Sequence, residues 1–197
     1  MTNYDVILNM ANKHNGIVTT RMVRSSGIAP QYLKRMLEQG CFEKTVRGVY
    51  VLPEVLEDEF VSLQARFKKG VYAKETALFL HDLTDRTPVA YVMTFPDGYN
   101  LTNVKEEGVI ANRAKEPYYS LGVEKGKSPS GNEVLVYNPE KTLCDILRPK
   151  SGVEKEVTTE AFKRYISKKE RNIPLLSEYA TKLKVEDKVR SYLEVLL

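Results

Sequence analysis

Long polar side chains gather on one face of a short helix that the sequence predicts in its first quarter. Pro30 suits the first position of this helix, and Gly40 can take the left-handed conformation that commonly follows a helix end. Between them, apolar residues recur at helical spacing, at Leu33, Met36 and Leu37. The opposite stripe consists of Gln31, Lys34, Arg35 and Glu38. Side chains of these types can hydrogen-bond to phosphates and to base edges, so this face fits a nucleic-acid partner.

A basic hairpin is expected directly after this helix. Residues 41–45 and 49–53 have the composition of two short strands, and residues 46–48 read as the turn between them. Lys44 and Arg47 place positive charge near the tip of the hairpin. A helix and a hairpin that act together need further elements to hold them in place.

Two predicted helices precede this pair and supply that support. The first covers residues 3–15 and the second covers residues 20–25, with Thr19 as the N-cap of the second. The second helix turns Arg21 and Arg24 away from its apolar face. Positive side chains are therefore expected on two successive helices and on the hairpin.

This order of helix, helix-turn-helix and two-stranded wing is that of a winged helix. In DNA-binding folds of this kind one helix enters the major groove, and its neighbours meet the phosphate backbone. The expected contacts are Arg21, Arg24, Gln31, Tyr32, Lys34, Arg35, Lys44 and Arg47. Two alternatives stay open, since winged helices also dock proteins and Tyr32 could pack on the wing instead. Glu38 is expected to pair with Lys34 at the i,i+4 spacing.

The distribution of charge supports an anionic partner for the first quarter of the chain. The formal net charge is +4 over 197 residues. Residues 1–53 hold seven Lys and Arg against three Asp and Glu, and the rest of the chain holds 23 of each. All of the excess positive charge therefore lies in the predicted winged helix.

Composition excludes several classes of protein. Hydrophobic residues make up 42% of the chain, as in an ordinary globular protein, and no apolar run approaches the ~20 residues of a membrane span. The first residues do not resemble a signal peptide, so we expect a cytoplasmic protein without membrane association. Cys41 and Cys144 lie far apart and in no metal-binding spacing, so two buried thiols are expected. No metal or cofactor site is predicted.

Residues 54–197 are expected to form a second, mixed domain, which makes the whole chain α+β. A connecting helix is predicted within residues 56–70, and another helix within residues 71–88. Four candidate strands and four helices follow, at residues 89–96, 108–114, 116–123, 132–138, 139–148, 158–170, 175–183 and 185–196. Residues 122–131 are expected to form a turn between strands.

Little in this second domain indicates an enzyme. His81 is followed by Asp82, but neither a nucleophile nor a metal-ligand set accompanies them, so a packed histidine is the simpler interpretation. Phosphate-binding glycine spacing is absent, and Cys144 lies on a helix face where a buried thiol is expected. Asp145 could cap its helix or pair with Lys141. The basic cluster at residues 163–172 could be a second anionic contact or a solvated helix end. No catalytic residue is predicted.

Three segments together resemble a known family. They are APQYLKRMLEQGCFEKTVRGVYVLP, KETALFLHDLTDRTP and NPEKTLCDIL, at residues 29–53, 74–88 and 138–147. This ordered set is similar to the AbiEi antitoxins of bacterial AbiE toxin–antitoxin systems, which are classed as type IV and act in abortive infection against phage. The resemblance implies a winged-helix autorepressor that binds inverted repeats in the promoter of its own operon.

The resemblance also implies a division of labour. The domain at residues 54–197 would supply antitoxicity, and the domain at residues 1–53 would bind operator DNA. The cognate toxin would be a nucleotidyltransferase-like protein, opposed without a stable complex. The same eight positions stand as DNA contacts, whereas no residue for antitoxicity can be carried over. The rival hypotheses are a transcriptional regulator whose second domain senses a ligand, and an enzyme acting on nucleic acid or nucleotides.

Overall fold

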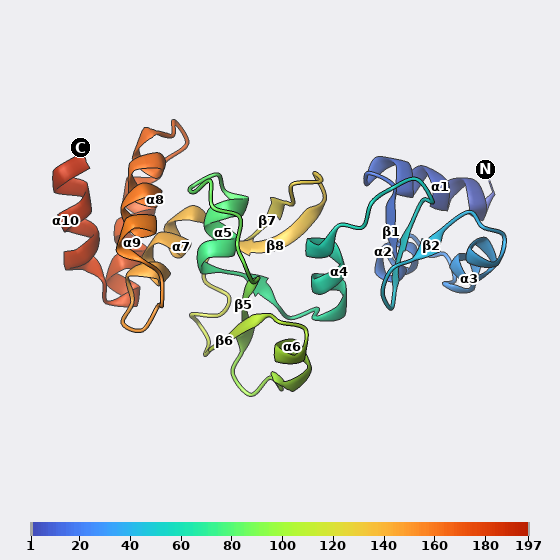
Figure 1. Ribbon diagram of the computed structural model, residues 1–197, viewed down its shortest axis with the longest axis horizontal. Coiled ribbons are helices and arrows are strands. Elements are labelled where there is room, and N and C mark those ends of the chain that lie inside the picture. Colours follow the sequence, from blue (N-terminus) through green and yellow to red (C-terminus); the bar gives the residue numbers. More distant parts are fainter. Residues whose placement is uncertain (1, 197) are drawn as a thin grey trace. The chain divides into compact units, whose positions relative to one another are not determined.

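The structure is a computed structural model that describes residues 2–196, and its chain divides into two compact units (Figure 1). Unit 1 extends to Lys68 and also includes Lys127–Val134. Unit 2 comprises Lys69–Gly126 and Leu135 onward. The predicted division of labour between residues 1–53 and 54–197 stays a prediction.

Unit 1 begins with a winged helix. The winged helix consists of α1 (Asn3–Lys13), β1 (Ile17–Thr19), α2 (Thr20–Ser25), α3 (Gln31–Glu38), β2 (Glu43–Lys44) and β3 (Val49–Val51). The helix α4 (Glu59–Arg66) follows it in the same unit. The predicted bounds of α2 are confirmed, since the Thr19 side chain accepts a hydrogen bond from Met22 N at 3.2 Å as its N-cap. Thr2 and Asp5 form a capping box at the start of α1.

The wing differs from the predicted hairpin by one additional strand. Within the described residues β3 lies between β1 and β2 and is antiparallel to both. Residues 17–19 form β1, which the sequence indicated only as a link between two helices. The predicted strand at residues 41–45 is shorter than expected, because Cys41 N still bonds to Met36 O, at 2.9 Å, and so closes the end of α3.

Two apolar clusters hold unit 1 together. One joins the three helices of the winged helix through Ile7, Val23 and Leu33, all fully buried. The second lies on the wing sheet, where Ile17, Val49 and Val51 pack against Val61 and Ala65 of α4. The predicted connecting helix therefore covers the wing and completes the core of this unit.

A buried carboxylate ties α4 to a loop that comes much later in the chain. Asp58 caps α4 by accepting hydrogen bonds from Phe60 N at 3.1 Å and Val61 N at 3.4 Å. Its other oxygen accepts from Ser128 Oγ and from Asn132 Nδ2, the latter at 2.8 Å. All three polar side chains are at most 5% exposed. Residues 127–134, the tip of a hairpin, thus belong to the packing of unit 1.

Unit 2 is a mixed sheet with helices, so the α+β class predicted for the chain is confirmed. Its strands are β4 (Val71–Tyr72), β5 (Val92–Pro96), β6 (Ile110–Ala114), β7 (Val123–Lys127) and β8 (Glu133–Tyr137), although the ends of the last two reach into unit 1. Within residues 2–196 the strand order is β6-β5-β4-β8-β7. β4 is antiparallel to β5 and parallel to β8, and β5 is parallel to β6.

Two sequence predictions for this sheet are wrong. Residues 116–123 were expected as a strand, but most of them form turns in which Tyr119 N bonds to Lys115 O at 3.1 Å and Leu121 N to Pro117 O at 3.0 Å. Residues 122–131 were expected as a turn, but the whole of β7 lies there. A polar edge strand carries little of the apolar alternation on which strand prediction depends.

Helices form the rest of unit 2. They are α5 (Lys74–Leu80), α6 (Thr102–Glu106), α7 (Pro139–Leu147), α8 (Lys155–Ser167), α9 (Ile173–Leu183) and α10 (Glu186–Leu196). α7 is buried almost along its whole length and packs with α5, α8, α9 and α10 around one apolar cluster. Among the described residues, no helix combines the length and apolar character that a membrane crossing requires.

Candidate nucleic-acid interface

The exposed face of α3 carries the residues that the sequence predicted for base recognition. Leu33 and Met36 are fully buried, which fixes the rotation of the helix about its axis. Gln31, Lys34 and Arg35 consequently point away from the core and are exposed. The helix therefore offers one amide and two cationic side chains to a partner.

Aromatic and acidic neighbours distinguish the two cations of α3. The Cζ atom of Arg35 lies 5.8 Å from the ring centroid of Tyr32. That ring meets Tyr4 of α1 edge to face, with centroids 5.9 Å apart and planes at 89°. Lys34 Nζ lies 3.9 Å from Glu38 Oε1, which confirms the predicted i,i+4 pair. Both partners of that pair are mostly exposed, so the interaction is weak and screened by salt.

α2 and the wing place the remaining candidates on the surface. Arg21 and Arg24 of α2 are exposed, while Val23 between them is buried. The wing turn is held against α2 because Thr20 N donates to Gly48 O at 2.9 Å, and Gly48 adopts φ +87°. Lys44 and Arg47 on the wing are also exposed.

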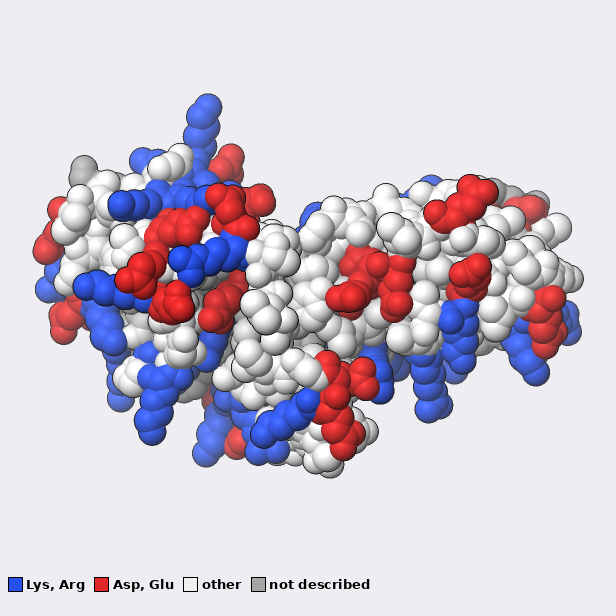
Figure 2. Space-filling view, in the orientation of Figure 1, with Lys and Arg blue, Asp and Glu red and all other residues white. Residues whose placement is uncertain are grey.

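Most of these candidates are free to engage an external group. Seven of the eight are exposed, whereas Tyr32 is half-buried. Within residues 2–196, no hydrogen bond or ion pair engages the side chains of Arg21, Arg24, Gln31, Lys44 or Arg47. In Figure 2, Lys and Arg side chains of unit 1 project from its lower edge, below α2 and α3. A surface of uncompensated cations favours binding to phosphates.

The histidine of unit 2 is packed, as the simpler interpretation of its sequence held. His81 Nε2 lies 2.8 Å from the Tyr137 carbonyl oxygen, which requires the Nε2–H tautomer as donor, and 3.9 Å from Glu124 Oε1. Burial is the main cause that lowers the pKa of His81, although the bond to Tyr137 opposes it. Within the described chain, no hydrogen bond or ion pair joins His81 to Asp82.

α7 buries charged residues that the sequence did not mark as buried. Lys141, 2% exposed, pairs with Asp145 as foreseen, and its Nζ lies 4.5 Å from the centroid of the Tyr137 ring. Glu140, 6% exposed, accepts a hydrogen bond from Tyr165 Oη at 2.7 Å. These contacts join the buried charges into a polar network inside unit 2, although Asp145 Oδ1 has no hydrogen-bond partner among the described residues. For the Lys141–Asp145 pair, the i,i+4 spacing was the signal available in the sequence.

The two cysteines are free thiols in different surroundings. Cys144 is fully buried, and burial raises the pKa of its thiol to about 12, so the nucleophilic thiolate is scarce at neutral pH. Cys41 is half-buried rather than buried as expected. Among residues 2–196, no group of His, Cys, Asp and Glu side chains is arranged to hold a metal ion.

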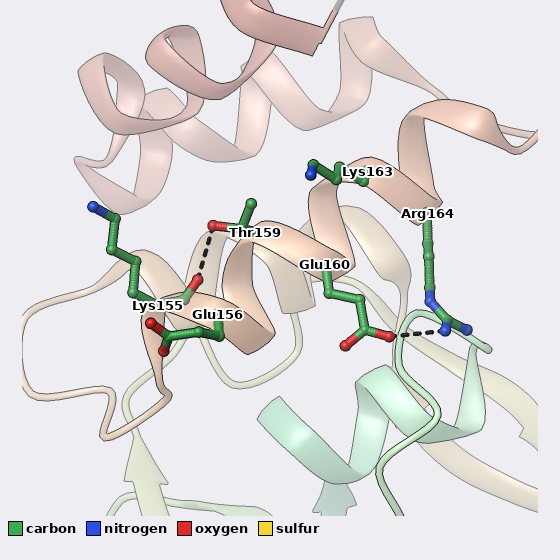
Figure 3. A pocket seen from close by; sticks show the side chains of 6 residues that line it. All are labelled: Lys155, Glu156, Thr159, Glu160, Lys163 and Arg164. Carbon is green, nitrogen blue, oxygen red and sulfur yellow. Dashed lines mark hydrogen bonds and ion pairs between the residues drawn. The ribbon is translucent and has the colours of Figure 1, made fainter.

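A shallow hollow on α8 contains part of the basic cluster noted in the sequence (Figure 3). It is lined by Lys155, Glu156, Thr159, Glu160, Lys163 and Arg164, all from the one helix. Arg164 pairs with Glu160 at 2.8 Å and also with Asp85, so its charge is compensated within the protein. The hollow mixes acids and bases, and these features match a solvated helix better than an anion-binding site.

Comparison with known proteins agrees with the architecture. The chain is similar in structure to the RV2827C protein from Mycobacterium tuberculosis, with a TM-score of 0.52 and 17% sequence identity, over 89% of this chain and 70% of that one. At this identity the likeness concerns the fold. A comparison with curated protein sequences gives no match.

A family model identifies the N-terminal segment. Residues 5–53 match the model described as "Transcriptional regulator, AbiEi antitoxin". The matched segment contains α2, α3 and the wing, with all eight candidate contacts. This segment is therefore similar to the AbiEi antitoxin transcriptional regulators, and the match supports the resemblance over residues 5–53.

Proposed function

We propose that this protein is a DNA-binding autorepressor of its own operon and the antitoxin of a type IV toxin–antitoxin system that acts in phage abortive infection. The observation that carries the DNA-binding part is the set of exposed cations on α2, α3 and the wing, most of which have no carboxylate partner within the described residues. The family match of residues 5–53 supports the regulatory role. The proposed partners are operator DNA with inverted repeats, which the protein binds, and a nucleotidyltransferase-like toxin. The protein would counteract this toxin in the cytoplasm without forming a stable complex with it.

We divide the proposed DNA contacts into two groups. Gln31, Lys34 and Arg35 lie on the exposed face of α3, the element suited to the major groove, and would meet base edges. The exposed cations of α2 and the wing would meet phosphates and set the position of α3 on the duplex. Tyr32 is placed in neither group, because its ring already packs against the ring of Tyr4.

Binding to duplexes from the region upstream of the protein's own gene tests the assignment. If Arg35 reads a guanine, Arg35→Ala should cost about 1–3 kcal/mol and relax specificity at one position. If Arg21 or Arg24 meets a phosphate, alanine there should weaken binding to all sequences alike and reduce the salt slope by about one unit. Lys13→Ala, an exposed cation at the end of α1, is the matched control. Unchanged affinity in all three arginine variants would remove this surface from consideration.

Antitoxicity is tested in the full chain with DNA binding removed. A triple variant, Arg21→Ala, Arg24→Ala and Arg35→Ala, is co-expressed from an unrelated promoter with the toxic neighbouring gene. We expect it to lose repression and to keep growth rescue, because unit 2 would supply antitoxicity. If the expressed wild-type chain does not rescue growth, the antitoxin proposal falls and a ligand-sensing repressor takes its place.

A further inference from the structure

The one aromatic side chain on the exposed side of α3 is tied to another helix. Tyr32 lies at the second position of α3, and its ring meets the Tyr4 ring of α1 edge to face at 5.9 Å. Both tyrosines are half-buried and pack against the apolar cluster of the winged helix. An edge-to-face pair fixes the orientation of both rings, so Tyr32 presents a face whose position is set by the core.

The guanidinium of Arg35 lies over that face. Tyr32 and Arg35 are three residues apart, which places them on neighbouring points of one helix surface. The separation of 5.8 Å between Arg35 Cζ and the ring centroid is within the range of cation–π attraction. A guanidinium held in this way keeps its N–H edge available to acceptors. Within residues 2–196, in contrast, the ion-pair partner of Lys34 is the exposed Glu38 at 3.9 Å.

We propose that Tyr32 is a positioning residue, which holds Arg35 for base recognition and does not itself contact DNA. This inference rests on the proposed function, because it assigns specificity within the same interface. A bidentate contact to guanine O6 and N7 requires both N–H groups at defined positions. A side chain restricted before binding loses less conformational freedom when the contact forms. Phosphate binding needs no such orientation, so Tyr32 should affect discrimination more than general affinity.

Four full-length variants separate positioning from direct contact. Tyr32→Phe keeps the ring without the hydroxyl, Tyr32→Met removes the ring, and both Arg35→Ala and the Tyr32→Met, Arg35→Ala double variant remove the cation. Tyr118→Leu, at a tyrosine 36% exposed in unit 2, is the matched control for losing a surface tyrosine. Dissociation constants are measured for a duplex from the protein's own promoter and for an unrelated duplex of equal length. The readout is the ratio of the two constants.

We expect both Tyr32→Phe and the control Tyr118→Leu to keep the wild-type ratio. Tyr32→Met should weaken binding to the promoter about two- to fivefold, the equivalent of an exposed cation–π contact, with little change for the unrelated duplex. In the Arg35→Ala background, Tyr32→Met should have no further effect on the ratio. Thermal unfolding of every variant identifies any loss of folded protein, and if Tyr32→Met unfolds, Tyr4→Leu tests the same support from the α1 side.

Other outcomes overturn the inference in distinguishable ways. A loss of ratio in Tyr32→Phe, or an effect of Tyr32→Met that persists without Arg35, would make Tyr32 a direct DNA contact. An equal loss for both duplexes would make it a structural residue only. An unchanged ratio in Tyr32→Met would show that Arg35 needs no support. If the wild-type protein does not prefer its own promoter, the proposed function itself fails.

Discussion

Replacing Asp58 with alanine tests whether the winged helix depends on residues outside it. The carboxylate is 4% exposed and accepts hydrogen bonds from two backbone amides of α4 and from the side chains of Ser128 and Asn132. Asn132 in turn accepts from Asn15 Nδ2 at 3.3 Å, at the end of the first helix of the winged domain. One side chain therefore links α4, the hairpin tip and the region after α1.

The expected magnitude follows from the groups that the substitution leaves behind. Loss of the N-cap costs about 0.5–2 kcal/mol. The hydroxyl of Ser128 and the amide of Asn132 then remain buried without their acceptor, at about 1–3 kcal/mol each. Together these costs predict that Asp58→Ala lowers the free energy of unfolding of unit 1 by about 2.5–8 kcal/mol, a large share of the ~5–15 kcal/mol that stabilises a typical domain. Asp58→Asn should cost less, because asparagine is also a good N-cap.

Urea unfolding monitored by circular dichroism, together with amide hydrogen exchange, measures this effect. Exchange should accelerate at amides of α1, α3 and α4 in Asp58→Ala, while amides of α7 to α10 keep their protection. Glu57→Ala removes a neighbouring exposed carboxylate and is the control. If the two variants unfold at the same urea concentration with the same protection, the Asp58 network contributes no stability and the reasoning is refuted.

Three further predictions concern unit 2. Lys141→Met should lower the free energy of unfolding by about 3–5 kcal/mol in urea titrations, because Asp145 stays buried without its hydrogen-bonded cation and, among the described residues, keeps only the half-exposed Arg148, 3.7 Å from its Oδ1. The paired change with Asp145→Leu should cost less. Gly122→Ala should cost about 1–3 kcal/mol, since its Cβ would lie 2.8 Å from Asn138 Oδ1 and from Lys141 Cβ, whereas Gly98→Ala, also at positive φ but with open space, reports the backbone cost alone. Burial lowers the pKa of His81 below its usual 6.5, so the unfolded chain takes up a proton first and this contribution to stability is lost as pH falls from about 6.5 toward the lower, folded-state pKa. His81→Gln should reduce the fall of the melting temperature with decreasing pH below about 6.5. An unchanged slope in this variant would exclude His81 as the cause of that pH dependence.

Local signals in the sequence were sufficient for the winged helix. Both signals depend on residues close together in sequence: Thr19 as an N-cap predicts the start of α2, and the spacing of Leu33 and Met36 predicts the buried face of α3. The structure confirms both predictions. The exposed positions of Arg21, Arg24, Gln31, Lys34 and Arg35 follow from the same helical periodicity. Their contact with DNA stays a prediction, whereas their presentation on one set of elements is observed.

Long-range pairing was out of reach of such signals. Strand β1 has only three residues, and its partners in β3 are about thirty residues away, so its pairing cannot be read from its own short sequence. The burial of Glu140, Lys141 and Asp145 was missed because charged residues are seldom buried. The i,i+4 spacing of Lys141 and Asp145 indicates a pair but not its burial, and Glu140 meets its partner Tyr165 only in the folded chain. The Tyr4–Tyr32 contact that supports Arg35 likewise joins two helices.

The packing of unit 1 also determines how its functions can be separated. A fragment of residues 1–53 lacks Val61 and Ala65, so it would expose the apolar sheet face formed by Ile17, Val49 and Val51. It would also lack the Asp58 network. Failure of such a fragment to bind DNA would then report unfolding, not the absence of a recognition surface. Substitutions at exposed side chains such as Arg21 and Arg35 leave this core intact, and they can therefore separate DNA binding from antitoxicity where truncation cannot.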